Sequence, residues 1–285
     1  MANEFSKLVN EKHGRKLVWH DEFEGNALDM DKWCFVRTMG AADRDYDNSD
    51  KHVRVEDGNL HLMVWPSDKE GINYSLPEGV TTKHTMNFKY GYLEMCARVP
   101  FRHGAWPSFW MQSCTPFQKA DYMAETDIFE IFSNPQDVVA NIHKWGQGKH
   151  VMVDGVEGSS IRYYRFEDHE NLNNEFHTYG FEWDEHDMRF YVDDHLFCTL
   201  HVDERGEFGT NDLPGMDGFH DPAFVILNNE IFSPGSSWHV DDWILTDADP
   251  MPIDYYIASM RLYQKEGEEI YLKDEIAAEA AKKQA

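Results

Sequence analysis

Three acidic side chains stand close together in a segment that is otherwise apolar. The segment reads Glu125-Thr-Asp127-Ile-Phe-Glu130-Ile-Phe, and its β-branched and aromatic residues predict a buried strand. Burying a carboxylate is costly unless it is paired or keeps its proton, so stability alone does not explain three acids here. Paired carboxylates perform general acid, general base and nucleophilic chemistry. We therefore predict a catalytic role for all three.

The spacing of the acids indicates which reaction they could perform. Side chains alternate along a strand, so Glu125 and Asp127 share a face, whereas Glu130 falls on the opposite face of a regular strand. A one-residue β-bulge near Ile128 and Phe129 would return Glu130 to the face of the other two. The two glutamate carboxyls could then approach to about 5 Å, the separation that a retaining glycosidase needs between nucleophile and acid/base. Asp127 could share a proton with the nucleophile and keep the pKa values of the pair apart.

Two other interpretations of this acidic segment stay open. The acids could lie on a solvated strand face, although the isoleucines and phenylalanines beside them indicate burial. They could also bind a metal ion such as calcium, but consecutive acids on one strand face lack the loop flexibility and carbonyl ligands that calcium recruits. Catalysis is the interpretation that we favour.

The elements that position these acids are predicted to be strands. Short runs of alternating apolar and polar residues, separated by turn residues, recur along the chain. The run from Val53 to Trp65 predicts a hairpin around Asp57-Gly58. Further strands are predicted at 90–99, 105–112, 125–132, 138–145, 178–183, 188–192, 196–202, 224–231 and 258–264. Because no long helical pattern separates them, these strands predict an all-β sandwich or barrel.

One helix is predicted, near the end of the chain. Residues 272–283 are rich in alanine, glutamate and lysine, which form helices well but here offer little apolar face to bury. The rest of the sequence contains no low-complexity linker and no repeat of fixed period. We therefore predict one domain over residues 1–270, followed by a helical tail over residues 271–285.

Composition excludes several classes of partner. The 285 residues include 52 Asp and Glu against 26 Lys and Arg, so the formal charge is −26 and a broadly basic surface for binding phosphates is not available. Nucleic acid and anionic membranes are therefore not expected as partners. The four cysteines form no CxxC pair, which argues against a structural zinc site. No apolar run reaches the roughly 20 residues of a membrane span.

Ordered motifs between about residues 17 and 264 resemble those of glycoside hydrolase family 16. The acidic segment fits the family's Glu-x-Asp-x-(x)-Glu strand, and the segments YGYLE, AWPSFWM and HTYGFEW fit three further strands. The other matching segments are 18–23, 97–100, 141–143, 191–193 and 260–264. The resemblance implies a β-jelly-roll sandwich of two antiparallel sheets, like concanavalin A, with a concave substrate groove. To this we add the short C-terminal helix.

The resemblance also implies roles for individual residues. Glu125 would be the nucleophile, Glu130 the general acid/base and Asp127 the assisting carboxylate. The residues expected to bind the sugar are Trp106, Trp110, His143, Trp145, Asn228 and Tyr122. The first two tryptophans offer flat apolar rings to the faces of sugar rings. Phe109, on the opposite face of their strand, is expected in the core.

Three departures from the family's pattern bear on these roles. Where members with the bulge often have a tryptophan just before the acids, this chain reads Lys119-Ala-Asp-Tyr-Met-Ala124, and Tyr122 is expected to substitute. Ala258 stands where many members have an aspartate that helps bind a structural calcium, so we predict no cofactor. Glu230 has no explanation from the sequence.

These observations predict a retaining endo-β-glycanase that hydrolyses β-1,3- or mixed β-1,3/1,4-glucan, such as laminarin or lichenan. The alternative substrate is a red-algal galactan, cleaved by an agarase, porphyranase or carrageenase type of the same family. The charge of −26 favours a neutral glucan, although Arg102, His103, His143 and Lys144 could supply a local basic groove. Transglycosylation is a further possibility. A non-catalytic lectin-like module is the competing class, but such a module has no need of three clustered acids.

The expected cellular setting follows from this substrate. Enzymes of this kind are usually exported, so we expect a secreted protein whose signal peptide is absent from this chain. A cytoplasmic enzyme that trims imported oligosaccharides is the alternative. The protein is expected to be a monomer.

Overall fold

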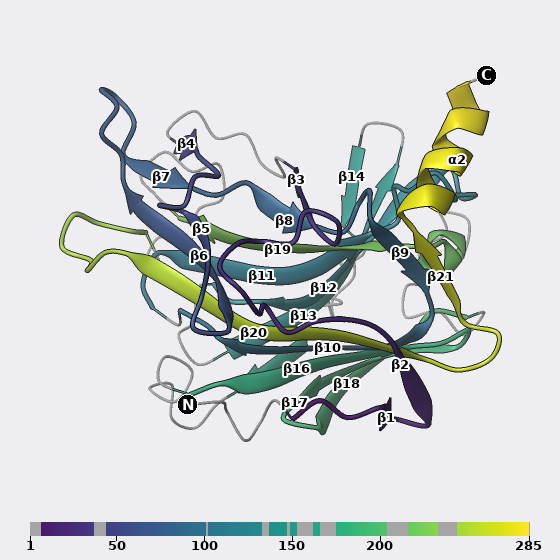
Figure 1. The fold of residues 1–285 in the computed structure, drawn as a ribbon. Coiled ribbons are helices and arrows are strands. Elements are labelled where there is room, and N and C mark those ends of the chain that lie inside the picture. The colour runs from purple at the N-terminus through teal and green to yellow at the C-terminus, as the bar shows by residue number, and fades with distance from the viewer. Residues whose placement is uncertain are drawn as a thin grey trace.

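The protein is a sandwich of two large β-sheets, one lying above the other (Figure 1). The computed structural model describes residues 7–36, 44–100, 102–132, 137–146, 149–152, 162–165, 175–203, 216–232 and 244–284. Among the described strands, pairing is antiparallel except between β4 and β7, which are parallel. The predicted fold class, an all-β jelly roll, is confirmed.

In the described residues, the first sheet has 11 strands. In spatial order its main path is β18 (His195–His201), β17 (Asp187–Val192), β16 (His177–Trp183), β10 (Gly91–Arg98), β20 (Ile253–Gln264), β6 (Asn59–Pro66), β7 (Tyr74–Leu76) and β4 (Arg44–Tyr46). Off this path lie β2 (Arg15–Asp21), which pairs with β20, β1 (Glu11–Lys12), which pairs with β2, and β5 (Val53–Glu56), which pairs with β6.

The second sheet, with 8 strands in the part of the chain that the structure describes, carries the acidic segment. Its main path is β14 (Lys149–Met152), β13 (Asp137–Gly146), β12 (Tyr122–Glu130), β11 (Ala105–Gln112), β19 (Phe224–Ile231), β8 (Gly79–Thr81) and β3 (Cys34–Val36). The remaining strand, β15 (Arg162–Arg165), pairs with β13. The acids of β12 therefore lie near the middle of this sheet, with β11 and β13 on either side.

The core fills the space between the two sheets. Phe109 of β11 and Phe129 of β12 are both 0 % exposed, and the Phe129 ring centroid lies 4.6 Å from that of Tyr179 in the first sheet. Each large apolar side chain buried in this way contributes about 2 kcal/mol to stability relative to an exposed one. The prediction that Phe109 lies in the core is confirmed.

Several strand positions match the sequence pattern. β11 and β19 have the predicted bounds, and the predicted hairpin is formed by β5 and β6. Asp57 and Gly58, the two residues of its turn, have φ values of 52° and 72°. A two-residue hairpin turn with both residues at positive φ suits an Asp-Gly pair, because glycine has no Cβ to strain.

A third, two-stranded sheet joins the end of the chain to the sandwich. β21 (Glu269–Leu272) pairs with β9 (Met86–Lys89), and the Tyr271 ring stacks on Phe117 with centroids 3.9 Å apart. Helix α2 (Lys273–Gln284) follows directly and stands at one end of the sandwich, with Ile276 only 3 % exposed (Figure 1). The predicted helix is present one residue further along the chain, and the boundary at residue 270 stays a prediction.

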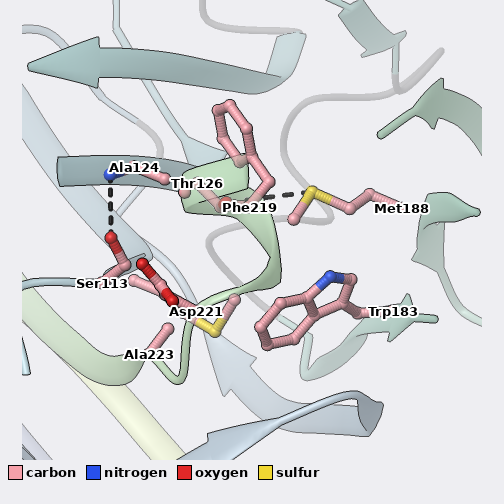
Figure 2. Close-up of a pocket in the computed structure, with 10 residues that line it drawn as sticks. Ser113, Ala124, Thr126, Trp183, Met188, Phe219, Asp221 and Ala223 are labelled. Atoms are coloured by element: carbon pink, nitrogen blue, oxygen red, sulfur yellow. Dashed lines mark hydrogen bonds between the residues drawn. The ribbon is translucent and has the colours of Figure 1, made fainter. Parts of the chain in front are cut away.

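A small cavity of about 10 Å³ lies between the sheets on the core side of β12 (Figure 2). Met111 and Thr126 line it from the second sheet, and Trp183 and Met188 line it from the first. The 3-10 helix η2 (Asp217–His220) closes it with Gly218 and Phe219. A cavity of this size has room for about one water molecule, so it is too small for a sugar.

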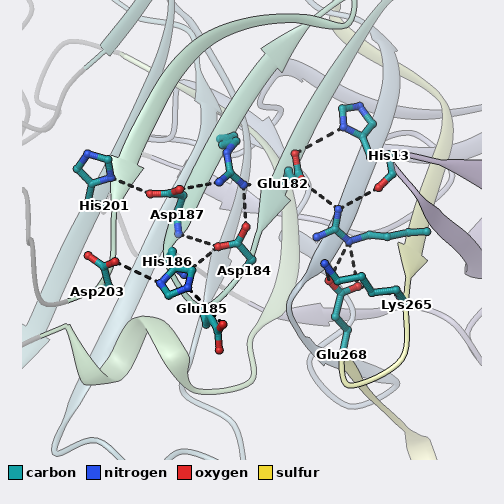
Figure 3. Close-up of polar contacts among 12 residues, drawn as sticks. His13, Glu182, Asp184, Glu185, His186, Asp187, His201, Asp203, Lys265 and Glu268 are labelled. Atoms are coloured by element: carbon teal, nitrogen blue, oxygen red, sulfur yellow. Dashed lines mark hydrogen bonds and ion pairs between the residues drawn. The ribbon is translucent and has the colours of Figure 1, made fainter.

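The outer face of the first sheet carries charged side chains in close pairs (Figure 3). Arg15, which is 2 % exposed, donates to Glu182 at 2.7 Å and to Glu268 at 2.9 Å. Hydrogen bonds from His13 and Arg15 lower the pKa of Glu182 to about 2. The β1–β2 hairpin is therefore fastened to β16 and to the turn between β20 and β21 by buried ion pairs.

Within the part of the chain that the structure describes, no helix is long and apolar enough to cross a membrane.

Candidate active site

A β-bulge in β12 brings the three acids onto one face. Asp127 is paired with Trp110 of β11, while Glu130 is paired with Ser108, so three steps along β12 match two steps along β11. The pairing of β12 with β13 shifts between the same two residues. The predicted bulge is confirmed, and its extra residue restores Glu130 to the side of the sheet that carries Glu125 and Asp127.

The side of the second sheet that carries the acids, here called the acid face, is assembled from four strands. Directly paired residues project to the same side, so the register identifies its members. They include Glu125, Asp127 and Glu130 of β12, Trp106, Ser108, Trp110 and Gln112 of β11, Asn141, His143 and Trp145 of β13, and Asn228 and Glu230 of β19. The structure therefore brings together every predicted site residue except Tyr122.

Each acid has a polar neighbour on the acid face. Gln112 Nε2 donates to Glu125 Oε2 at 3.2 Å, and Trp106 Nε1 donates to Glu130 Oε1 at 2.9 Å. His143 Nε2 lies 3.0 Å from Asp127 Oδ2. Glu125 and Glu130 are half-buried, whereas Asp127 is only 3 % exposed. The two glutamates are thus reachable from outside, and the aspartate lies beneath them.

Burial raises the pKa of all three acids. Desolvation is the largest cause in each case, and Asp127, when it is ionised, raises the pKa of both glutamates further. The pKa of Glu130 rises to about 8, despite the opposing hydrogen bond from Trp106. Glu130 therefore keeps its proton at neutral pH, which is the state a general acid requires. Glu125 and Asp127 repel one another, so this pair favours holding a single proton.

Two of the residues predicted to bind the sugar are hydrogen-bonded to each other. Trp110 Nε1 donates to Asn228 Oδ1 at 2.6 Å, which fixes the orientation of both side chains. Both residues lie beside Ser108 on the acid face, and the Trp110 side chain is half-buried. Trp110 and Asn228 therefore form an ordered polar and aromatic surface next to the acids.

Trp106 differs from Trp110 in its surroundings. Its ring stacks on Phe232 with centroids 4.6 Å apart and an interplanar angle of 15°, so one face of the indole is covered. Phe132 contacts it edge-on at 6.3 Å. Trp106 is therefore packed on one face by Phe232, and its N–H is bound to Glu130.

The prediction that Tyr122 substitutes for a tryptophan in the sugar-binding wall is wrong. β12 begins at Tyr122, three residues before Glu125, so alternation turns the phenol to the core side of the sheet. Tyr122 is 3 % exposed, and its hydroxyl accepts a hydrogen bond from the Gly218 N–H at 2.7 Å. Met123, which is paired with Trp145, occupies the acid face instead.

Lys144 does not contribute to a basic groove on the acid face. It follows His143 on β13 and so projects to the core side, where its Nζ lies 5.1 Å from the centroid of the Tyr122 ring. The side chain is 4 % exposed, and burial lowers the pKa of its ammonium group. Of the four basic residues proposed from the sequence, His143 is the one placed on the acid face by strand pairing.

Gln112 and Asn141 belong to the acid face but were not predicted from the sequence. Gln112 is two residues after Trp110, so alternation along β11 could have identified it. Asn141 is the direct partner of Asp127, and its Nδ2 lies 2.9 Å from His143 Nε2. Asn141 could have been found in the same way, two residues before His143.

Two places in the described part of the chain do not fit a calcium ion. Ala258 of β20, at the position of the family's calcium-binding aspartate, offers no ligand atom. Among the described residues, ligand atoms of Glu125, Asp127 and His143 lie within 4.8 Å of one another. Two carboxylates and an imidazole nitrogen do not resemble the six to eight oxygens that calcium takes.

Comparison with known proteins places this site in a known class. A family model described as glycosyl hydrolases family 16 matches residues 41–214, more than half of the chain. Glucan endo-1,3-beta-glucosidase A1 of Niallia circulans is 26 % identical over 276 residues, which cover 89 % of this chain but 38 % of that protein. Glucan endo-1,3-beta-glucosidase of Cryptopygus antarcticus is 28 % identical over 257 residues, covering 80 % of this chain and 86 % of that protein.

A solved structure is similar over nearly the whole chain. It is described with the words "Prominent members of the human gut microbiota express endo-acting O-glycanases to initiate mucin breakdown". Its TM-score is 0.70 and its identity is 26 %, with 96 % of this chain and 97 % of that chain covered. Together these matches define the protein as a glycoside hydrolase. The chain belongs to family 16 of the glycosyl hydrolases, which confirms the resemblance in its motifs.

Proposed function

We propose that the protein is a retaining endo-β-glycanase that hydrolyses β-1,3- or mixed β-1,3/1,4-glucan. The observation that carries this proposal is the bulge in β12, which sets two half-buried glutamates and a buried aspartate on one face of the sheet. Membership of family 16 and similarity to two glucan endo-1,3-beta-glucosidases support the choice of reaction and substrate.

The first step uses both glutamates. A carboxylate oxygen of Glu125 attacks the anomeric carbon, while protonated Glu130 transfers its proton to the glycosidic oxygen. The bond between that carbon and oxygen breaks, the reducing-end fragment leaves as an alcohol, and the remaining sugar is esterified to Glu125. The raised pKa of Glu130, about 8, supports its part as the proton donor.

The second step reverses the role of Glu130. Now ionised, Glu130 takes a proton from a water molecule whose oxygen attacks the same anomeric carbon. The ester bond breaks, Glu125 is released as a carboxylate, and Glu130 is again protonated. Because the carbon is attacked twice from opposite sides, the product keeps the β configuration.

Asp127 keeps the nucleophile ionised. Glu125 and Asp127 favour a single shared proton, and the aspartate is the more deeply buried of the two. Burial favours the neutral form of a carboxyl group, so the proton resides on Asp127 and Glu125 remains free to attack. His143, 3.0 Å from Asp127, orients this carboxyl.

The sugar-binding surface extends along the acid face from the acids. Trp110 and Asn228 lie on one side of β12, and His143 and Trp145 lie on the other. Aromatic rings pack against the C–H faces of sugars, and the amide of Asn228 can bind a hydroxyl group. A neutral glucan suits the chain's charge of −26, because it does not experience the repulsion that a sulfated polymer would.

An endo-acting O-glycanase is a second candidate function. The structure described as relating to endo-acting O-glycanases is 26 % identical and covers 96 % of this chain. This candidate uses the same two glutamates and differs only in the sugars bound around them.

Digestion of a polysaccharide panel tests the proposal. The panel contains laminarin, barley β-glucan, agarose, porphyran and mucin O-glycans, and products are sized by chromatography and examined by NMR as they form. We expect oligosaccharides from laminarin and barley glucan, with the β-anomer appearing first. Cleavage of the galactans or O-glycans alone would replace the glucan assignment, and initial release of the α-anomer would contradict the mechanism.

Export from the cell and a monomeric state are part of the same proposal. A polymer too large to enter a cell is degraded outside it, which supports secretion. Size measurement in solution tests the monomer, and fractionation of the producing cells tests the location.

A further inference from the structure

A buried ion pair lies on the acid face, beyond the acids themselves. Glu230 of β19 is 2 % exposed, and its Oε2 lies 3.1 Å from Nε of Arg44 in β4. The Tyr46 hydroxyl donates to Glu230 Oε1 at 3.0 Å, and Arg44 Nη2 donates to the Ile231 carbonyl oxygen. These side chains fasten β4, a strand of the first sheet, to the end of β19 in the second.

The end of β19 is in turn packed against Trp106. Glu230 is the direct cross-strand partner of Trp106, and side chains in such pairs have Cβ atoms about 4.5–5.5 Å apart. Phe232, two residues later, stacks on the indole, and its N–H donates to the Gly104 carbonyl oxygen at 2.9 Å. The position of this indole therefore depends on where β4 holds the end of β19.

Within the described residues, the Trp106 side chain donates a hydrogen bond to Glu130. Its Nε1 is 2.9 Å from Glu130 Oε1, and the indole is a rigid ring with one N–H direction. Fixing one oxygen of the carboxyl leaves the other to carry the proton toward the substrate. An error of about 1 Å in such a group can cost a factor on the order of 100 in rate.

We propose that Arg44, Tyr46 and Glu230 are positioning residues that fix Trp106, and that Trp106 aims the carboxyl group of Glu130 at the leaving oxygen. This inference rests on the proposed function, because it requires Glu130 to act as the general acid. A buried ion pair adds little net stability compared with well-packed apolar side chains. Its presence beside the acid face is therefore explained by the geometry that it imposes.

The test compares two substrates that differ in their need for an acid. The glycosidic oxygen of a polysaccharide must be protonated to leave, whereas dinitrophenolate leaves without a proton. We would measure kcat/KM on the cleaved glucan and on the 2,4-dinitrophenyl glycoside of a β-1,3-linked disaccharide. In the double variant Arg44→Met/Glu230→Leu, we expect kcat/KM on the glucan to fall roughly 10- to 100-fold and that on the aryl glycoside to change less than about twofold.

Thermal melting first checks whether the double variant folds. If it does not, two single variants test the same inference. Trp106→Phe keeps the stacked ring but removes the N–H, and should show the same selective loss on the glucan. Tyr46→Phe removes one hydrogen bond to Glu230 and should show a smaller loss of the same kind. Trp110→Phe is the matched control, since it removes an indole N–H bound to Asn228 rather than to Glu130, and should lower both rates by similar factors.

The inference fails in either of two cases. One is an equal loss on both substrates in the folded double variant, which would indicate a general structural role. The other is an unchanged rate on the glucan in that variant. A wild-type protein that cleaves no member of the panel would instead overturn the proposed function, so the two failures are distinguishable.

Discussion

Acidic side chains in the two sheets have opposite electrostatic surroundings. On the outer face of the first sheet, Glu182 and Glu268 flank the guanidinium of Arg15, and the pKa of Glu182 falls to about 2. On the acid face of the second sheet, the described partners of Glu125 and Glu130 are neutral donors. There the pKa of Glu130 rises to about 8.

The difference separates stability from chemistry. An acid paired with arginine is held in its charged form and cannot donate a proton near neutral pH. A buried acid without such a partner resists ionisation, which destabilises the fold but creates a proton donor. The first arrangement fastens strands together, and the second is suited to cleaving a bond.

The largest expected effect comes from replacing an acid of the acid face. Glu125→Gln should lower kcat on the cleaved polysaccharide by at least about 10⁴-fold, because it removes the nucleophile. It should also raise the melting temperature at pH 7, because a buried charge is lost. Glu182→Gln, the same substitution on the other sheet, should leave kcat unchanged and lower the melting temperature. Wild-type turnover by Glu125→Gln would disprove the assignment.

The second-largest expected effect comes from replacing Arg15 on the outer face of the first sheet. Arg15→Met removes the buried cation that lies between Glu182 and Glu268, and breaking a buried ion pair in this way costs about 3 kcal/mol or more. We expect the melting temperature to fall by roughly 6–12 °C, with kcat per folded molecule unchanged at 25 °C. A melting temperature within a degree of the wild type would show that the pair does not hold the β1–β2 hairpin.

The pH dependence of stability should have opposite signs for the two regions. The pKa of Glu130 rises from 4.5 to about 8, so over this window the folded chain holds a proton that the unfolded chain releases. Raising the pH through the window therefore lowers the free energy of unfolding. The pKa of Glu182 falls from 4.5 to about 2, so its contribution is full above pH 4.5 and is lost as the pH falls toward 2.

Melting curves at a series of pH values check this. The gain in melting temperature of Glu130→Gln over the wild type should grow from pH 4.5 to pH 8 and reach a few degrees, about 2–4 °C for each kcal/mol. The deficit of Glu182→Gln should shrink as the pH falls below 4.5. Parallel curves for all three proteins would contradict the opposing shifts.

The smallest effect is expected where an ion pair is exposed. Lys273 of α2 lies 2.8 Å from Asp31, and both side chains face solvent. Exposed pairs contribute little, because water screens the charges and ordering two side chains costs entropy. Lys273→Ala should therefore change the melting temperature by less than about 1 °C. A larger change would mean that an exposed ion pair stabilises this protein as well as a buried one does.

Much of the site could be predicted because it depends on alternation along strands. The bounds of β11 and β19, the core position of Phe109 and the bulge in β12 all follow from which residues share a face. Tyr122 was misplaced because the predicted strand began at residue 125, which left the three residues before it outside the alternating pattern. The structure begins β12 at Tyr122.

Other features could not be predicted, because they join distant parts of the chain. Glu230 was left unexplained, and its partners Arg44 and Tyr46 lie more than 180 residues away in sequence. β4 is only three residues long, too short for any periodic pattern to mark it. The pairing of β21 with β9 could not be predicted either, because the composition of a strand does not specify which strand it pairs with.

The bulge in β12 has a consequence for how this segment tolerates changes in length. Deletion of Ile128 would remove the bulge. Two steps along β12, from Asp127 to Glu130, would then match two steps along β11 and β13. All three acids would still project from one side, because they would then be spaced at every second residue. What the shortened segment would lose is the extra bend and twist that a bulge gives a strand. The additional isoleucine therefore adjusts the angle between the two glutamates rather than the choice of surface on which they stand.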